Sequence, residues 1–234
     1  MRGLFVTATD TGVGKTVLAA SILAALRARG ERVAAFKPVV TGCEEPVDPD
    51  WPPDDALLAA AAGASPDEVT TARFGPPVSP HLASALAGAA PLDPGALRRA
   101  FDARAARGET VVVEGVGGLL VPLAPDYLVR DLARELGLPL VVAAGPGLGT
   151  INHTLLTLAA ARAAGLRVAG VVMTPWPERP SAMEEDNRAT VARLGEVEVA
   201  CLARVARADV ALLARAGAGL PLERWLAEPP TRAR

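Results

Sequence analysis

An eight-residue segment, Thr9–Thr16, limits what this 234-residue chain can fold into more than any other feature. It reads Thr-Asp-Thr-Gly-Val-Gly-Lys-Thr, and it lies between the apolar run Leu4–Val6 and a helical stretch that begins at Thr16. A glycine-rich turn between a strand and a helix lets backbone N–H groups surround phosphate oxygens, while the helix N-terminus adds partial positive charge. The segment therefore predicts a phosphate-binding loop (P-loop), although Thr9 stands where the general pattern begins with glycine.

The P-loop residues have different expected roles. The Lys15 ammonium is expected to hold the β- and γ-phosphates of a nucleotide and to count among the catalytic groups, and the Thr16 hydroxyl to ligate Mg²⁺. An ordinary strand–turn–helix connection is the alternative, and the Gly-Lys-Thr sequence at a helix start disfavours it. The predicted nucleotide contacts in this loop are Gly12, Val13, Gly14, Lys15 and Thr16.

The rest of the chain alternates apolar runs with helical stretches, which is typical of a parallel sheet covered by helices. Half of the residues are hydrophobic but only 3% are aromatic, so Ala, Val and Leu must fill the core. We predict a single α/β domain of the P-loop NTPase type over residues 1–228, with a mostly parallel sheet and helices on both faces, and a frayed tail at 229–234. The expected strands are Leu4–Val6, Val33–Phe36, Val111–Val113, Leu140–Ala143 and Val168–Met173. The expected helices are Thr16–Arg29, Pro94–Arg107, Leu128–Leu136, Asn152–Ala164 and Ala182–Leu194, with left-handed glycine caps at Gly30, Gly108, Gly137, Gly165 and Gly195.

Charge and cysteine content exclude several classes of function. Lys and Arg total 24 against 26 Asp and Glu, and no basic block is present, so we expect binding to neither nucleic acid nor a membrane surface. No apolar run reaches the roughly 18 residues of a membrane span. Cys43 and Cys201 have no metal-ligand spacing, which favours a reducing, cytoplasmic compartment.

A second lysine follows the second expected strand, in the segment Phe36–Gly42. Ligands of parallel sheets bind outside the carboxyl ends of the strands, so Lys37 is expected to project toward the phosphate site. Its ammonium could neutralise charge on a transferred phosphoryl group or on an anionic substrate, and Thr41 could donate a hydrogen bond nearby. The alternative is a solvated loop lysine.

Three valines precede the segment Glu114–Gly118, which reads Glu-Gly-Val-Gly-Gly. A buried strand that ends in a carboxylate and a flexible glycine loop is how a Walker-B-type acid reaches Mg²⁺, which prefers one or two carboxylates together with phosphate oxygens. The alternative is a strand that ends in a turn, with Glu114 facing water.

Other polar residues carry weaker signals. Asp54 and Asp55 precede Ala56-Leu57-Leu58, and on the residues alone a helix N-cap is the favoured interpretation for one of them. His81 and His153 are expected to be structural, because no partner can be named for either. The loop Gly145–Gly149 leads into a helix whose free N–H groups could receive a carboxylate.

Taken in order, these segments resemble the dethiobiotin synthetase family over about three quarters of the chain, from the P-loop to about Pro175. The segments that carry the resemblance are Thr9–Thr16, Lys37-Pro38-Val39 with Thr41-Gly42, Asp55-Ala56-Leu57, Ser79-Pro80-His81, Glu114–Gly118 and Leu148–His153.

The resemblance implies a homodimer that binds 7,8-diaminopelargonate, CO2 and ATP with Mg²⁺, and closes the ureido ring of dethiobiotin through a carbamate and a carbamic–phosphoric anhydride. It makes Lys37 the catalytic lysine and Thr41 a substrate contact, and it moves Asp55 from helix cap to metal ligand. The implied metal ligands are Thr16, Asp55 and Glu114. The implied nucleotide contacts beyond the P-loop are Asp55, Glu114, Gly115, Val116, Gly117, Thr174 and Pro175, and the implied substrate contacts across the dimer are Leu148, Gly149 and Asn152.

The resemblance weakens toward the C-terminus. Thr174 occupies a strand-end position where better-known family members have an asparagine that contacts the nucleotide base. The segment Ala203–Ala206 replaces a later Gly-x-x-Pro pattern. We therefore expect relaxed selectivity for adenine. Two rival functions are a P-loop partitioning or switch ATPase, which usually has a second lysine where this chain has Asp10, and a related amidoligase domain, which works with a glutaminase domain.

Overall fold

A six-stranded sheet forms the centre of the molecule. The computed structural model describes residues 2–46, 48–107 and 109–227, and the tail expected at 229–234 lies outside them. Neighbouring strands of the sheet are parallel throughout, which confirms the predicted fold class. The strand order is β2 (Val33–Phe36), β3 (Thr110–Glu114), β1 (Gly3–Ala8), β6 (Leu140–Ala144), β7 (Val168–Trp176) and β8 (Val199–Ala203).

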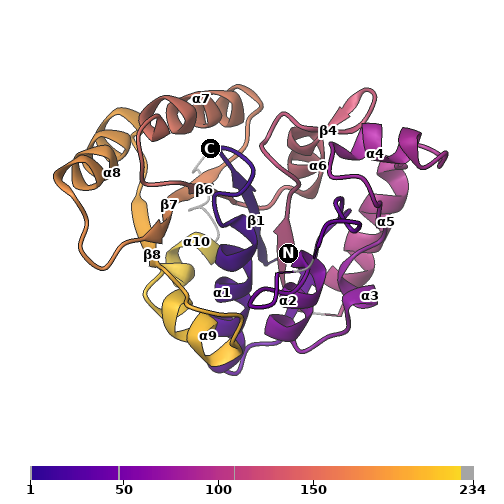
Figure 1. The fold of residues 1–234 in the computed structure, drawn as a ribbon, viewed down its shortest axis with the longest axis horizontal. Helices are drawn as coiled ribbons and strands as arrows, with labels where there is room; N and C mark the ends of the chain where they lie inside the picture. Colours follow the sequence, from indigo (N-terminus) through magenta and orange to yellow (C-terminus); the bar gives the residue numbers. More distant parts are fainter. Residues whose placement is uncertain (1, 47, 108, 228–234) are drawn as a thin grey trace, which may run out of the picture.

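Helices cover both faces of this sheet (Figure 1). On one face lie α1 (Lys15–Ala28), α2 (Asp54–Ala62), α9 (Val210–Ala218) and α10 (Leu222–Leu226). On the other face lie α5 (Pro94–Ala105), α6 (Val129–Leu136), α7 (Thr150–Ala163) and α8 (Ala182–Gly195). The remaining elements are two short helices, α3 (Pro66–Val69) and α4 (Pro80–Leu86), and an antiparallel pair, β4 (Pro122–Ala124) and β5 (Tyr127–Leu128).

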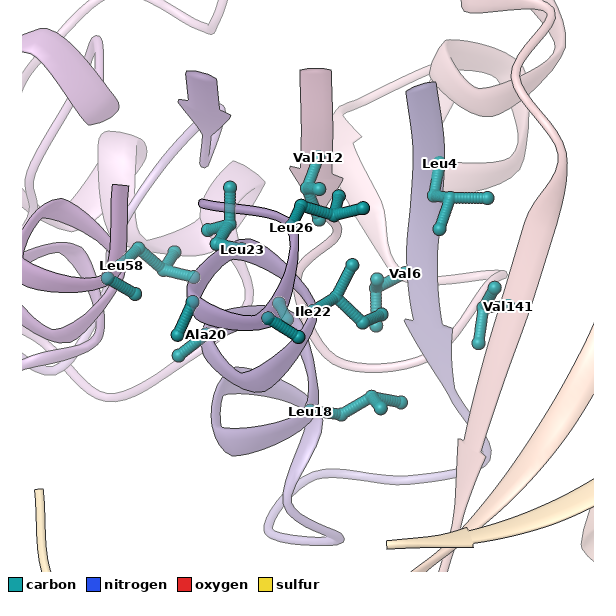
Figure 2. Packing of buried hydrophobic residues seen from close by; sticks show 14 of the residues in the cluster. Leu4, Val6, Leu18, Ala20, Ile22, Leu23, Leu26, Leu58, Val112 and Val141 are labelled. Carbon is teal, nitrogen blue, oxygen red and sulfur yellow. The ribbon is translucent and has the colours of Figure 1, made fainter. Parts of the chain in front are cut away.

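The strands divide their side chains between two cores, because successive residues of a strand point to opposite faces. In β1, Leu4 and Val6 belong to the core under α1, and Phe5 belongs to the core on the opposite face. Figure 2 shows Leu18, Ile22 and Leu26, which recur every four residues along α1, pointing toward the strands. This packing fixes the start of α1, and with it the P-loop, against the end of β1.

Sequence patterns missed β8, α9 and α10 and the short elements α3, α4, β4 and β5, and they misplaced one helix cap. Gly30, Gly137 and Gly165 have the expected positive φ. The prediction for Gly195 is wrong, because α8 includes this glycine and Glu196 takes the left-handed position with φ of 45°. Gly108 lies outside the described residues. Within the described part of the chain, no helix is long and apolar enough to cross a membrane.

The contact between α1 and α9 depends on the missing side chain of Gly217. A Cβ at this position would lie 2.1 Å from the backbone oxygen of Ser21 in α1. We expect Gly217→Ala to lower the free energy of unfolding by about 1–3 kcal/mol, because the overpacking cost exceeds the roughly 1 kcal/mol gain in helix propensity. Urea denaturation measures this change. The control is Gly219→Ala, whose Cβ would have no neighbour closer than 4.0 Å and whose φ is −79°; equal effects of the two variants would contradict the prediction.

Candidate active site

Three of the segments singled out in the sequence meet at one edge of the sheet. The strands that precede them, β2, β3 and β1, are neighbours in the sheet. Phe36 pairs with Val113, and Val6 pairs with Glu114, so Lys37 and Glu114 lie level with Val6, and the P-loop begins three residues after Val6, directly beyond the end of β1. Because parallel strands end at the same edge, this register brings the three segments together.

The P-loop has the backbone shape that its glycines allow. Gly12 and Gly14 have φ of 76° and 89°, a region that residues with a Cβ rarely adopt. Gly14 is the N-cap of α1, and its carbonyl accepts the first helical hydrogen bond from Leu18 N at 3.0 Å. The free N–H groups at this end of α1 suit an anionic ligand.

A polar cluster of five side chains forms in front of the P-loop. The Thr16 hydroxyl lies 2.9 Å from Asp54 Oδ1 and 3.0 Å from Glu114 Oε1. Lys37 Nζ donates to Glu114 Oε1 at 2.7 Å and is also hydrogen-bonded to Asp54 Oδ2. Lys15 Nζ lies 3.5 Å from the same Glu114 oxygen. The chain contains only these two lysines, and both lie in this cluster.

The electrostatic environment of the two lysines differs. Burial alone would lower the pKa of Lys37, but the charges of Glu114 and Asp54 outweigh it, so the pKa is raised and the ammonium stays charged. Burial lowers the pKa of Lys15. The negative charge of Glu114 offsets this lowering only in part, and the positive charge of Lys37 adds to it. Burial alone would raise the pKa of Asp54, but the positive charge of Lys37 has the larger effect, so the pKa is lowered. Lys15 is therefore the cation of the cluster that is least compensated by negative charge.

The structure corrects the assignment of the second acid, the one that accompanies Glu114. Asp54, not Asp55, lies beside Thr16 and Lys37. Asp55 Oδ2 instead accepts from Arg73 Nε at 2.7 Å. The helix-cap interpretation is also wrong: Pro53 is the N-cap of α2 without a side-chain cap bond, and both aspartates lie in the first helical turn. Adjacent helical residues point about 100° apart, so only one of the two can face the cluster.

The donor set of the cluster fits Mg²⁺. Glu114 is fully buried, and among the described residues its Oε2 atom has no hydrogen-bond partner. A hydroxyl and two carboxylates that converge, one with an unused buried oxygen, suit a hard cation that also takes phosphate oxygens. The cluster has only two carboxylates, and the described residues contain no group of three or more His, Cys, Asp or Glu side chains able to hold a metal ion.

A cavity of about 910 Å³ opens beside the cluster. Lys15, Lys37 and Thr41 line it together with an apolar wall that includes Val116 and Val121. Gly117, in the loop after β3, has φ of 57°, and a Cβ there would lie 2.9 Å from Val121 Cγ2. The backbone of this loop therefore requires glycine at position 117. The cavity that it borders has both charged and apolar walls.

The comparisons with known proteins show the family of this chain. A family model described as an AAA domain matches residues 2–208. An ATP-dependent dethiobiotin synthetase from Mycobacterium sp. (strain KMS) is 44% identical over 86% of this chain and 87% of the relative. This chain belongs to the dethiobiotin synthetase family. Members from Anaeromyxobacter sp. (strain Fw109-5) and Bacillus licheniformis are 44% and 40% identical, over 83% and 82% of this chain and 86% and 81% of their own lengths.

Two solved structures share the fold. A ParA family ATPase from Chlorobium tepidum TLS has a TM-score of 0.52 at 10% identity, with 95% of this chain and 92% of the other covered. A cobyrinic acid a,c-diamide synthase from Mycobacterium smegmatis with bound ADP and magnesium has a TM-score of 0.50 at 19% identity, with 92% and 91% covered. At these identities the likeness shows the P-loop fold alone, which the dethiobiotin synthetase family shares.

The strand-end residue Thr174 lies against the P-loop. It is 2% exposed, and a Cβ on Gly14 would lie 3.3 Å from its hydroxyl oxygen. Thr174 and Pro175 belong to β7, which continues to Trp176. The segment after β8 is held to this strand end, because Arg204 N donates to the Trp176 carbonyl at 3.2 Å. Both segments expected near the nucleotide base are thus adjacent to each other.

The predicted substrate contacts on the loop before α7 and in its first turn, Leu148, Gly149 and Asn152, do not line the cavity of this chain. α7 begins at Thr150, two residues earlier than predicted, and Gly149 is its N-cap with φ of 91°. Leu148 is 93% exposed, and Asn152 is exposed. Sequence patterns did not single out Asn187, a buried residue of α8 that donates to the carbonyls of Pro146 and Gly147 at 2.8 and 3.1 Å and so holds this loop.

The two histidines lie apart from the cluster. His81 is in the first turn of α4 and contacts the Ser79 hydroxyl at 3.0 Å through Nδ1. His153 is exposed on α7. Neither lines the cavity.

Proposed function

We propose that this protein is an ATP-dependent dethiobiotin synthetase that closes the ureido ring of dethiobiotin from 7,8-diaminopelargonate and CO2. The observation that carries the proposal is the cluster of Thr16, Lys37, Asp54 and Glu114 beside a P-loop and a mixed charged and apolar cavity. Family membership supports the choice of substrate. One amine forms a carbamate with CO2, a carbamate oxygen attacks the γ-phosphorus with release of ADP, and the second amine displaces phosphate from the anhydride.

Each residue of the cluster has a role in this reaction. Two anions, the carbamate and the triphosphate, must meet, so positive charge is needed to offset their repulsion. Lys15 holds the β- and γ-phosphates, and Lys37 stabilises charge on the transferred phosphoryl group. Thr41 orients the diamine. When bound, Mg²⁺ supplies charge neutralisation and orients the phosphates, and Thr16, Asp54 and Glu114 are the residues that would hold it.

Substrate-dependent phosphate release tests the proposal. Purified protein is given ATP, Mg²⁺ and bicarbonate, with and without 7,8-diaminopelargonate, and phosphate and dethiobiotin are measured together. We expect phosphate and dethiobiotin in equal amounts, and only with the diamine. Phosphate release that is independent of the diamine would instead support a switch ATPase.

We also propose a cytoplasmic homodimer in which the loop before α7 completes the site of the partner. The exposed Leu148, the exposed Leu156 on α7 and the free N–H groups at the start of α7 support this role. A monomer in sedimentation equilibrium at micromolar concentration, with full activity, would contradict it.

Nucleotide selectivity is a further part of the proposal. Thr174 has a single short hydroxyl and lies in contact distance of the P-loop, so it offers the base fewer hydrogen bonds than an asparagine amide. We expect kcat/KM for ATP, CTP and GTP to agree within about tenfold, equivalent to about 1.4 kcal/mol. Initial rates at saturating diamine measure this. A preference for ATP of a hundredfold or more would contradict relaxed selectivity.

A further inference from the structure

Arg73 contacts three separate segments of the chain. Its Nε donates to Asp55 Oδ2 at 2.7 Å in the first turn of α2, and its Nη1 lies 2.9 Å from Asp67 Oδ1 in α3. Its backbone is paired with Val40, because Val40 N donates to the Ala72 carbonyl at 3.0 Å and Phe74 N donates to the Val40 carbonyl at 2.9 Å.

The same pairing holds the segment of the catalytic lysine. Lys37 is three residues before Val40, and its N–H donates to the Val69 carbonyl at 3.0 Å. Asp55 is the direct neighbour of Asp54, and its side chain is only 7% exposed. The arginine thus ties the start of α2, which carries Asp54, to the segment that carries Lys37.

We propose that Arg73 is a positioning residue, which sets the rotation of the first turn of α2 so that Asp54 faces Thr16 and the metal site. The inference rests on the proposed role of Asp54 as a metal ligand. Between Lys37 and Asp54 the chain runs through Thr41–Pro53, a connection with no helix or strand of its own among the described residues. In this connection no regular secondary structure fixes the orientation of α2 relative to the Lys37 segment, and the ion pair of Arg73 with Asp55 fixes it instead.

A rival explanation is that Arg73 only neutralises the buried carboxylate of Asp55. An unpaired buried charge is strongly destabilising, so Arg73→Met alone would lower stability under either explanation. The double variant Asp55→Asn/Arg73→Met distinguishes the two explanations, because it removes the buried charge of Asp55 together with the ion pair that positions α2. Recovery of both stability and metal binding in the double variant would overturn the proposal.

Metal affinity is the first readout. Mn²⁺ binding in the presence of ADP is followed by electron paramagnetic resonance of the free ion, without diamine or turnover. We expect Arg73→Met and the double variant to weaken Mn²⁺ binding by about tenfold to a hundredfold, as is common for residues that orient ligands. Arg98→Met is the matched control: it removes a 2.9 Å ion pair with Asp102 on α5 and leaves Mn²⁺ binding unchanged.

The second readout uses the low lysine content of the chain. Protein labelled with ¹³C at the lysine ε position gives two signals, from Lys15 and Lys37, because these are the only lysines. We expect the Lys37 signal to shift in the double variant without metal, because Asp54 leaves Lys37. An unchanged Lys37 signal, with wild-type Mn²⁺ affinity, would overturn the positioning role.

Asp54→Asn distinguishes failure of this inference from failure of the proposed metal site. If Asp54→Asn leaves Mn²⁺ binding unchanged, the assignment of Asp54 as a metal ligand fails and the positioning role fails with it. If Asp54→Asn weakens Mn²⁺ binding and Arg73→Met does not, the metal site stands and only the positioning role is overturned.

Discussion

Lys37→Ala should lower the diamine-dependent rate of phosphate release by about a hundredfold to a thousandfold, the usual effect of removing a group that stabilises charge in a transition state. Lys37 is 3% exposed and lies 2.7 Å from the buried Glu114 oxygen, so water cannot easily replace its ammonium. The expected loss is in kcat, because the charge on the transferred phosphoryl group develops as the reaction proceeds. Steady-state phosphate release with saturating ATP and diamine measures it.

Lys37→Arg separates charge from shape in this experiment. It keeps the positive charge but replaces a compact ammonium with a larger planar group in a buried position. We expect this variant to remain impaired by tenfold or more, because the guanidinium cannot occupy the space between Asp54 and Glu114. If Lys37→Ala retains at least a tenth of the wild-type kcat, Lys37 does not act on the transferred group.

Glu114→Gln should have the second large effect, on both metal binding and stability. The cluster holds two lysines and two carboxylates, and Glu114 contacts both lysines. Without its charge, two buried ammonium groups share the single carboxylate of Asp54. Breaking a buried ion pair by removing one partner costs about 3–5 kcal/mol. We expect a loss of that size in the free energy of unfolding, measured by urea denaturation without nucleotide, together with loss of Mn²⁺ binding.

Glu198→Gln is the control for this prediction. Glu198 pairs with Arg224 at the surface, where the two side chains are 37% and 72% exposed. Removing an exposed pair costs about 0–1 kcal/mol, because water screens both charges. If Glu114→Gln proves as stable as Glu198→Gln, the charges of the buried cluster are balanced by groups other than Glu114.

The meeting of Lys15, Lys37 and Glu114 could be predicted because it depends on strand direction more than on side-chain detail. Each residue follows a short apolar run, and the carboxyl ends of parallel strands lie at one edge. The positive φ of Gly12 and Gly14 follows in the same way from the residue types of the P-loop. Strands and helices with strong periodicity, such as β1 and α1, were found within a few residues.

The position of the second acid could not be predicted in this way. Asp54 and Asp55 have the same chemistry and adjacent positions, and only the rotation of α2 decides which one faces Thr16. That rotation is tied to Arg73, a residue 18 positions away from Asp55. The roles of β8 and Asn187 could not be predicted for a similar reason. Both depend on contacts with segments that are distant along the chain.

By itself, the sequence determined the fold class, the P-loop and the two segments, those of Lys37 and Glu114, that converge on it. These features arise from local patterns: apolar runs, glycines at turns and lysine or glutamate at strand ends. The tertiary structure decided that Asp54 completes the cluster, that Arg73 holds Asp55, and that the exposed Leu148 and Asn152 do not line the cavity of their own chain. The physical reason is that burial and charge pairing between distant segments decide which of two chemically equal neighbours, such as Asp54 and Asp55, enters the site. These contacts form only in the folded chain.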